Sequence, residues 1–287
     1  MNKRPAAVPA TALTLTLTLA ACSGSGDSED STGKSTTGMT VSHIHGLGLD
    51  PADQRLYVAT HEGVYTPDVN GEPELVGDSK DDFMGFTVAG AKTFYASGHP
   101  IAGGNKGLIK SDDAGKTWKS LSLSGESDFH ALEFAHGMVH GYDSTNGLVR
   151  TTKDGVSWKD GARLEALDIA VSPQDPGLVL ATTADGVARS ADGGKTFTKG
   201  EKPVMAFLSW AAKDALYGID ASGGVHRSSD GGGTWKKVAT VPGGQPQALT
   251  AVDAEHILAA TQTGVYESKD GGKTFTKRLA VESNGAH

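Results

Sequence analysis

Short apolar segments of four to six residues recur along most of the chain and alternate with turns rich in glycine, aspartate and serine. In each unit a first apolar segment is followed by a second and then by a third that opens with glycine, as in Gly63-Val64-Tyr65. The second segments are residues 56–60, 93–96, 138–142, 178–182, 216–219 and 257–261. Short strands with evenly spaced turn residues, and no amphipathic helical segment of useful length, predict an all-β fold.

An eight-residue box closes most of these units. It reads Ser-Asp-Asp-Ala-Gly-Lys-Thr-Trp at residues 111–118, recurs at 190–197, 228–235 and 268–275, and is shortened at 152–158. Its closing aromatic residues stand at 118, 158, 197, 235 and 275, so the steps are 40, 39, 38 and 40 residues. A fixed period of about 40 residues is typical of a propeller or a solenoid. We therefore predict a six-bladed β-propeller, whose first blade keeps the strands but lacks the box.

The pattern Ser-x-Asp-x-Gly-x-Thr-Trp/Phe resembles the Asp-box, or BNR repeat, of sialidase-like and sortilin-like β-propellers. That superfamily includes glycoside hydrolases, sortilin-type receptors and a photosystem assembly factor, so the resemblance implies the fold and leaves the function open. Sialidases grip a carboxylate with three arginines. Here Arg150, Arg189 and Arg227 share one repeated position just before the box, away from a central pocket, so a sialidase mechanism is not expected.

The box also has a local physical explanation. Its aspartate can accept backbone N–H groups within the turn, and the glycine that follows tolerates a positive φ. Because the same residues recur from blade to blade, we interpret the aspartates as structural residues that staple a hairpin, and not as catalytic groups. They are Asp113, Asp154, Asp192, Asp230 and Asp270.

The N-terminus has the pattern of an export signal. Lys3 and Arg4 precede an apolar run over residues 6–21, which is too short for a membrane-spanning helix. The ending Leu-Ala-Ala-Cys resembles the bacterial lipobox, in which the cysteine is acylated, and Cys22 is the only cysteine in the chain. We therefore expect an exported protein anchored to the cell envelope, with the membrane as a partner through lipidated Cys22.

Three segments follow from this assignment. Residues 1–22 are predicted to be the lipoprotein signal peptide, residues 23–40 a flexible tether rich in glycine, serine and threonine, and residues 41–287 the propeller. The chain has 26 basic and 34 acidic residues, for a formal net charge of −8. An acidic chain without a basic stripe argues against nucleic acid as a partner and leaves a glycan or a protein as the expected ligand.

Candidate chemistry gathers at one mouth of the predicted channel. In antiparallel blades the start of each first strand and the end of each second strand reach the same face. Alignment of the first strands places six residues at one position: His45, Met84, His130, Leu167, Met205 and Ala248. We therefore expect the following side chains to surround one mouth: His43, His45, Met84, His99 and His130, with Asp82 and Asp128.

Three functions are compatible with such a mouth. Imidazole with thioether suits copper, and imidazole with carboxylate suits zinc, although the fold itself requires no cofactor. Alternatively, two of Asp82, Asp128 and Glu165 could serve as acid and base in a glycoside hydrolase. In the third interpretation the polar residues line a hydrated channel and the propeller presents a surface to a partner. We favour this last function, a membrane-tethered extracytoplasmic binding or assembly module with its ligand site at the mouth of blades 1–4.

Overall fold

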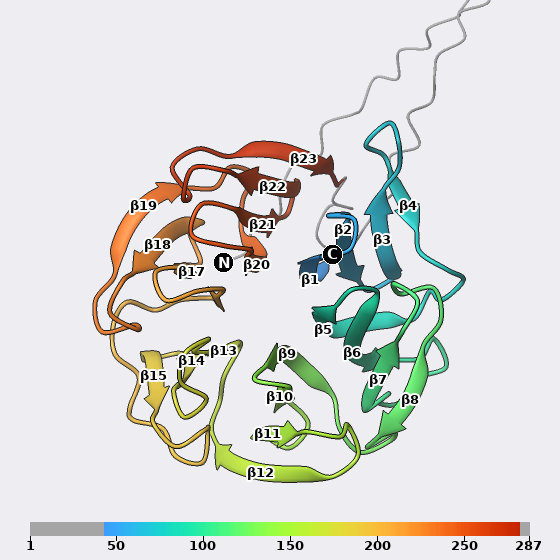
Figure 1. Ribbon diagram of the computed structural model, residues 1–287, viewed down its shortest axis with the longest axis horizontal. Helices are drawn as coiled ribbons and strands as arrows, with labels where there is room; N and C mark the ends of the chain where they lie inside the picture. The colour runs from blue at the N-terminus through green and yellow to red at the C-terminus, as the bar shows by residue number, and fades with distance from the viewer. Residues whose placement is uncertain (1–42, 282–287) are drawn as a thin grey trace, which may run out of the picture. The chain divides into compact units, whose positions relative to one another are not determined.

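The short apolar segments form strands, and each group of consecutive strands folds into its own antiparallel sheet. The computed structural model describes residues 43–281, so the predicted signal peptide, the tether and Cys22 lie outside the described residues. Six separate sheets surround a central axis as the blades of a propeller (Figure 1). The predicted all-β, six-bladed fold is confirmed. No helix between residues 43 and 281 is long and apolar enough to cross a membrane.

The first three blades contain four strands each. Blade 1 consists of β1 (Ile44–Leu49), β2 (Leu56–Thr60), β3 (Gly63–Pro67) and β4 (Pro73–Leu75). Blade 2 consists of β5 (Asp82–Gly90), β6 (Thr93–His99), β7 (Leu108–Ser111) and β8 (Lys119–Ser122). Blade 3 consists of β9 (Phe129–Ala135), β10 (Met138–Asp143), β11 (Leu148–Thr152) and β12 (Trp158–Arg163).

The last three blades follow the same order from the axis outward. Blade 4 consists of β13 (Ile169–Val171), β14 (Val179–Thr183) and β15 (Gly186–Ser190). Blade 5 consists of β16 (Phe207–Trp210), β17 (Leu216–Ile219), β18 (Gly224–Ser228) and β19 (Lys236–Thr240). Blade 6 consists of β20 (Pro246–Ala251), β21 (Ile257–Thr261), β22 (Gly264–Ser268) and β23 (Thr276–Ala280).

Blade 4 differs from the expected pattern because it lacks a fourth strand in the described structure. The segment after its box makes an isolated bridge between Val187 and Glu201 and one further main-chain hydrogen bond, from the N–H of Thr198 to the carbonyl oxygen of Arg189. That segment contains Gly200 and Pro203. Glycine weakens a strand and proline cannot donate to a ladder, which explains why these contacts do not extend into a regular strand.

The ring closes by packing of blade 1 against blade 6, without exchange of a strand. The apolar side chains of Ile44, Leu47 and Leu258 belong to one buried cluster that spans the two blades. Thr250 Oγ1 donates a hydrogen bond of 2.9 Å to the carbonyl oxygen of Leu47 across the same junction. Each blade therefore keeps its own strands, and burial between neighbouring blades holds the ring.

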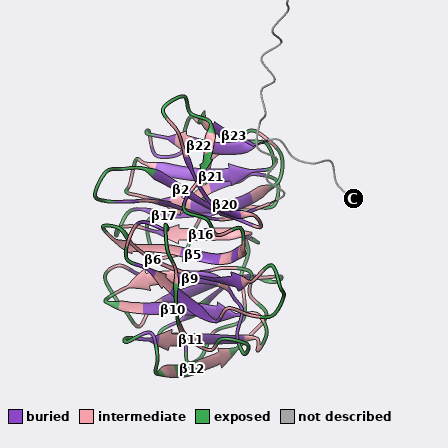
Figure 2. Ribbon diagram, turned by 90° about the vertical axis from the view of Figure 1, so that its right-hand side faces the viewer, coloured by how far each residue is buried: buried purple, intermediate pink, exposed green. Residues whose placement is uncertain are grey.

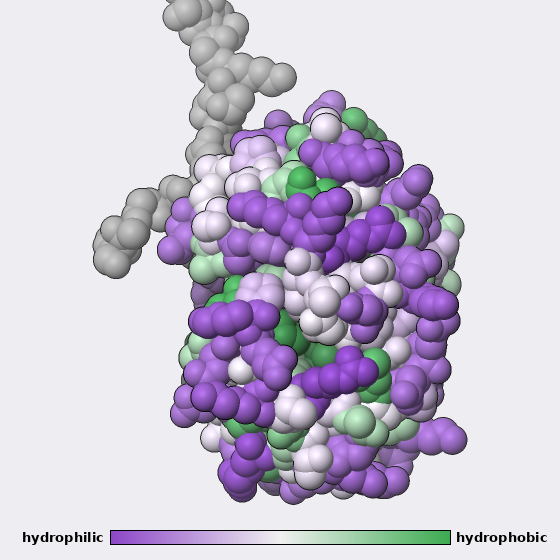
Figure 3. Space-filling view, turned by 90° about the vertical axis from the view of Figure 1, so that its left-hand side faces the viewer, coloured by the Kyte–Doolittle hydropathy of each residue, from purple (hydrophilic) through white to green (hydrophobic). Residues whose placement is uncertain are grey.

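Burial falls from the axis to the rim. In side view the strands β10 and β21 are largely buried, whereas the outer strand β12 is mostly intermediate or exposed (Figure 2). The outer wall seen in Figure 3 is predominantly hydrophilic, with small separated apolar spots. The side of the propeller in that view thus has the character of a solvated surface.

The box forms a closed network of short hydrogen bonds. In the copy at residues 190–197, Ser190 Oγ donates to Asp192 Oδ1 at 2.8 Å and accepts the N–H of Gly194 at 2.8 Å. Asp192 in turn accepts the main-chain N–H of Thr196 at 2.9 Å and its hydroxyl at 2.7 Å. Gly194 has a φ of +84°, which favours glycine. These bonds lie in the turn that follows β15, away from the axis.

Candidate functional site

Four of the inner strands carry one unpaired residue at the same end. The unpaired residue lies between two residues that pair with the second strand, so each strand contains a β-bulge. The four bulge residues are His45 in β1, Met84 in β5, His130 in β9 and Gln247 in β20. A bulge breaks the alternation of a strand and redirects a side chain, and such bulges are frequent beside functional sites.

The bulges correct part of the predicted alignment. In blade 6 the residue equivalent to His45 is Gln247, because Ala248 is paired with Ala260. Leu167 and Met205 precede the first residues of β13 and β16 and occupy no bulge. Sequence alternation cannot reveal this shift, since one inserted residue exchanges the two faces of a strand.

Three side chains from two blades converge at the mouth. They are His45 on β1, His61 directly after β2, and Asp82 at the start of β5. His45 Nε2 lies 3.3 Å from His61 Nδ1 and 3.9 Å from Asp82 Oδ1. His61 Nδ1 lies 3.0 Å from the same Oδ1. We call these three residues the triad; their nitrogen and oxygen atoms all lie within 4.8 Å of one another, so they could hold a metal ion.

His43 supports the triad from one side. Its ring centroid is 4.7 Å from that of His45 and 5.9 Å from that of His61. The side-chain amide of Gln247 donates from Nε2 to His43 Nδ1 at 3.2 Å. Because Nδ1 accepts this bond, neutral His43 carries its proton on Nε2.

The pKa values of the three histidines are shifted in different directions by their surroundings. Burial, followed by repulsion from a charged His61, lowers the pKa of His45 to about 2. The same two causes lower the pKa of His43. The hydrogen bond with Asp82 instead raises the pKa of His61. His45 is therefore neutral at ordinary pH and keeps a lone pair, whereas His61 holds its proton more tightly beside Asp82 and would release that proton to a bound metal ion.

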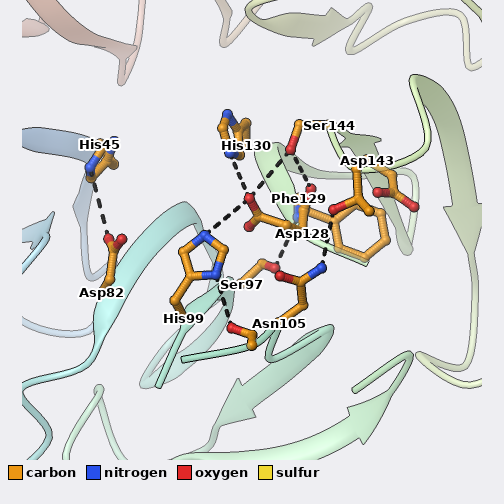
Figure 4. Close-up of polar contacts among 12 residues, drawn as sticks. His45, Asp82, Ser97, His99, Asn105, Asp128, Phe129, His130, Asp143 and Ser144 are labelled. Atoms are coloured by element: carbon orange, nitrogen blue, oxygen red, sulfur yellow. Dashed lines mark hydrogen bonds and ion pairs between the residues drawn. The ribbon is translucent and has the colours of Figure 1, made fainter. Parts of the chain in front are cut away.

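A second group of side chains surrounds Asp128, which is 4% exposed. His130 Nε2 lies 2.6 Å from Asp128 Oδ2, and His99 Nε2 lies 3.3 Å from the same oxygen (Figure 4). Ser144 Oγ donates to Oδ2 at 3.3 Å. One buried carboxylate oxygen thus lies against two imidazole rings and a hydroxyl at the mouth.

The backbone of blade 2 brings His99 to this position. A Cβ atom on Gly98 would lie 2.0 Å from the carbonyl oxygen of Asp82, so only glycine allows β5 and β6 to approach here. His99 Nδ1 lies 2.9 Å from the carbonyl oxygen of Gly104. A carbonyl only accepts, so Nδ1 carries a proton and the ring orientation of His99 is fixed.

A cavity of about 490 Å³ runs along the axis and is lined by the inner strands of all six blades, with His45 and His130 among its lining residues. Two further carboxyl groups line it, Glu133 on β9 and Asp168 just before β13. Burial raises the pKa of Glu133 to about 8 and that of Asp168 to about 7. Each accepts one main-chain N–H from the next blade, Val171 to Glu133 at 2.7 Å and Leu208 to Asp168 at 2.8 Å.

The structure therefore brings most of the predicted residues to one mouth and leaves two apart from the hydrogen-bonded groups. Met84 is the half-buried bulge residue of β5. Glu165 is exposed and lines a separate pocket near β13. Sequence reasoning omitted His61 from the cluster and missed Glu133 and Asp168. The signals were present: His61 ends a second strand at the mouth, and Glu133 interrupts an apolar inner strand.

No protein-family profile matches the chain, and no curated protein matches it in sequence. Solved structures do match it. The GH74 enzyme of Niastella koreensis is 17% identical with a TM-score of 0.62, over 84% of this chain and 46% of that one. A putative gluconolactonase is 14% identical with a TM-score of 0.60, over 84% of this chain and 91% of that one.

A chain of a nidogen/laminin complex is 12% identical with a TM-score of 0.60, over 80% of this chain and 96% of that one. At these identities the likeness concerns the fold alone, and fold does not determine function. The chain spans 46% of the length of the GH74 enzyme that it matches. It is similar in fold to β-propellers of enzymes and of a protein complex.

Proposed function

We propose that the protein is an extracytoplasmic binding module, anchored to the membrane through lipidated Cys22, which binds a divalent transition-metal ion at the mouth of its propeller. The ion is held by the triad of His45, His61 and Asp82. His43 packs beside His45 and His61, and the pair of His99 and Asp128 lies at the same mouth.

The spacing of the triad atoms carries this proposal. Zinc bonds of about 2.0–2.1 Å in a tetrahedral site require ligand atoms about 3.3 Å apart. The three separations among His45 Nε2, His61 Nδ1 and Asp82 Oδ1 are 3.3, 3.0 and 3.9 Å. A set of three protein ligands leaves the fourth position open for water or a ligand.

The chemistry of the donor atoms favours zinc or a similar divalent ion. Two imidazoles with one carboxylate form a borderline donor set, whereas Cu(I) prefers thiolate or thioether ligands. Neutral imidazole is the form that binds a metal, and His45 is held neutral by burial. The negative charge of Asp82 offsets one of the two positive charges of a divalent ion at this site.

Isothermal titration of the purified full-length protein with zinc chloride tests the metal site. We expect one ion per chain, and at least a tenfold loss of affinity in the variants His45→Ala and His61→Ala. His226→Ala is the matched control, because His226 on β18 makes a similar contact of 2.8 Å with Asp220, which directly follows β17. Equal zinc binding by wild type and a His45→Ala/His61→Ala double variant would contradict the proposal.

The anchoring part of the proposal is supported by the sequence around Cys22 and is tested separately. Membrane fractionation of cells that express the full chain should place wild type in the membrane fraction. The variant Cys22→Ala should lose its lipid and leave the membrane fraction. A membrane fraction that is unchanged by Cys22→Ala would contradict lipid anchoring without affecting the metal site.

A further inference from the structure

A buried carboxylate holds His130 in one tautomer. The contact of 2.6 Å between His130 Nε2 and Asp128 Oδ2 requires a proton between them, and an ionised carboxylate can only accept. Neutral His130 therefore carries its proton on Nε2 and its lone pair on Nδ1. An imidazole that is oriented by a carboxylate on its other nitrogen is the arrangement of a general base.

This pair is built on rigid backbone. His130 is the bulge residue of β9, and its neighbour Phe129 is fully buried. The N–H of Phe129 donates to Ser97 Oγ at 3.0 Å, which ties the start of β9 to blade 2. A strand fixed in this way holds a reactive group in place better than a loop does.

The pair faces the same space as the triad. His130 and His45 both line the axial cavity. Figure 4 shows His45, Asp82, His99 and His130 around one opening. A water molecule on an ion in the triad would therefore lie near a proton acceptor.

A second pocket, mostly apolar and with Glu165 in its wall, shares Leu167 with the axial cavity. It has a volume of about 340 Å³ and lies between blades 4 and 5, where Val204, Met205 and Ala206 line it. Leu167, which is 52% exposed, lines both this pocket and the axial cavity. A small apolar substituent can be buried there while its polar end lies at the mouth.

We propose that the mouth is a hydrolytic site for an uncharged carboxylic ester or lactone with an apolar substituent, in which His130 accepts the proton and Asp128 positions it. The inference rests on the proposed metal site. The net charge of −8 disfavours anionic substrates such as phosphate esters. An alkoxide leaves with less assistance from an acid than an amine does, which favours an ester over an amide.

The reaction balances with water as the co-reactant. A zinc ion held by His45, His61 and Asp82 would lower the pKa of a water molecule at the mouth. That water gives one proton to His130 Nδ1 while its oxygen bonds to the carbonyl carbon. The C–O bond to the leaving group then breaks, and the proton passes from His130 to the leaving alkoxide. The products are a carboxylic acid and an alcohol, or one hydroxy acid from a lactone.

Hydrolysis of p-nitrophenyl butyrate by the zinc-loaded full-length protein tests the inference. We expect turnover above a zinc buffer blank, and a loss of kcat of about 100-fold or more in His130→Gln. Zinc affinity should stay unchanged in that variant, and added imidazole should restore part of the activity of His130→Ala. Asp128→Asn should lower kcat with little change in KM, and His226→Ala should match wild type.

The outcomes separate the two proposals. A protein that binds zinc at the triad but shows no turnover above the blank overturns the hydrolytic inference and leaves the metal site intact. Turnover that survives His130→Gln, or that imidazole cannot restore in a folded His130→Ala variant, also overturns it. Absence of zinc binding overturns the proposed function itself. Thermal melting of each variant identifies any that fails to fold, and imidazole rescue then decides between a chemical and a structural role.

Discussion

The main-chain N–H of Ile44 donates a hydrogen bond of 3.1 Å to Oε1 of Gln247, 203 residues further along the chain. The other end of the same amide donates to His43. One side chain therefore joins the first and last inner strands and also orients a histidine of the mouth. In a ring without strand exchange, such contacts at the junction add to the apolar packing that holds blades 1 and 6 together.

Replacement of this amide should weaken the ring. Gln247→Leu leaves the buried N–H of Ile44 without its partner, so we expect a loss of about 1–3 kcal/mol in the free energy of unfolding. Chemical denaturation measures it, with Gln262→Leu at an exposed position as control. Equal stability of Gln247→Leu and wild type would show that the packing of the junction alone closes the ring.

The serine of a box should contribute measurably to stability. Ser190 is 1% exposed, and its Oγ joins Asp192 to the N–H of Gly194. Ser190→Ala leaves that N–H unpaired, and we expect a destabilisation of about 1–3 kcal/mol. Ser124→Ala, at an exposed position, should change the midpoint of urea unfolding very little. If the two variants unfold at the same midpoint, the box is not a staple.

Acid should destabilise the propeller through the boxes. Hydrogen bonds from the threonine that closes the turn lower the pKa of Asp192, Asp230 and Asp270 to about 2 in the folded protein. The unfolded chain takes up these protons near pH 4. The stabilisation is therefore present above about pH 4 and is lost as the pH falls towards 2.

Melting temperatures between pH 7 and pH 2 check this dependence. A triple variant with asparagine at these three positions should melt lower than wild type at pH 7 and show a flatter decline below pH 4. Asp185→Asn, at an exposed aspartate outside any box, should keep the wild-type slope. If the melting temperature of the triple variant falls with pH as steeply as that of wild type, other carboxylates cause the acid sensitivity.

Alkali should destabilise the channel wall through Glu133. Burial raises the pKa of Glu133 to about 8, so the folded state prefers the protonated acid. The unfolded chain ionises near pH 4.5, and folding is therefore progressively disfavoured from about pH 4.5 up to pH 8. Glu133→Gln mimics the neutral acid and can still accept the N–H of Val171. We expect its melting temperature to exceed that of wild type at pH 9 by more than at pH 5.

Glu165→Gln is the matched control for Glu133→Gln. Glu165→Gln removes a carboxylate from an exposed position near β13 and should leave the pH profile of stability unchanged. If Glu133→Gln and wild type lose stability in parallel as the pH rises, Glu133 is ionised in the folded protein.

The repeat period made the fold predictable. The box recurs at steps of 38–40 residues, and a glycine opens each third segment. These two patterns gave the first residues of β3, β15, β18 and β22 correctly. This works because turn chemistry is local: the side chains of Ser190 and Asp192 bond only within their own turn. The absence of a fourth strand from blade 4 was not predicted. The segment after its box contains glycine and proline, and whether such a segment pairs as a strand depends on its tertiary contacts.

The sequence predicted most of the residues that lie at the mouth, but not which side chains contact one another there. Strand direction alone places His45, Asp82 and His130 on one face, and the structure keeps them there. Which imidazole meets which carboxylate depends on the bulges at His45 and His130, on the close approach at Gly98 and on the angle between blades. The sequence by itself determined the blades and the face that carries the histidines. Only the tertiary structure selected His61 and Asp82 as partners of His45, because neither the bulge at His45 nor the contact between blades 1 and 2 has a local signature in the chain.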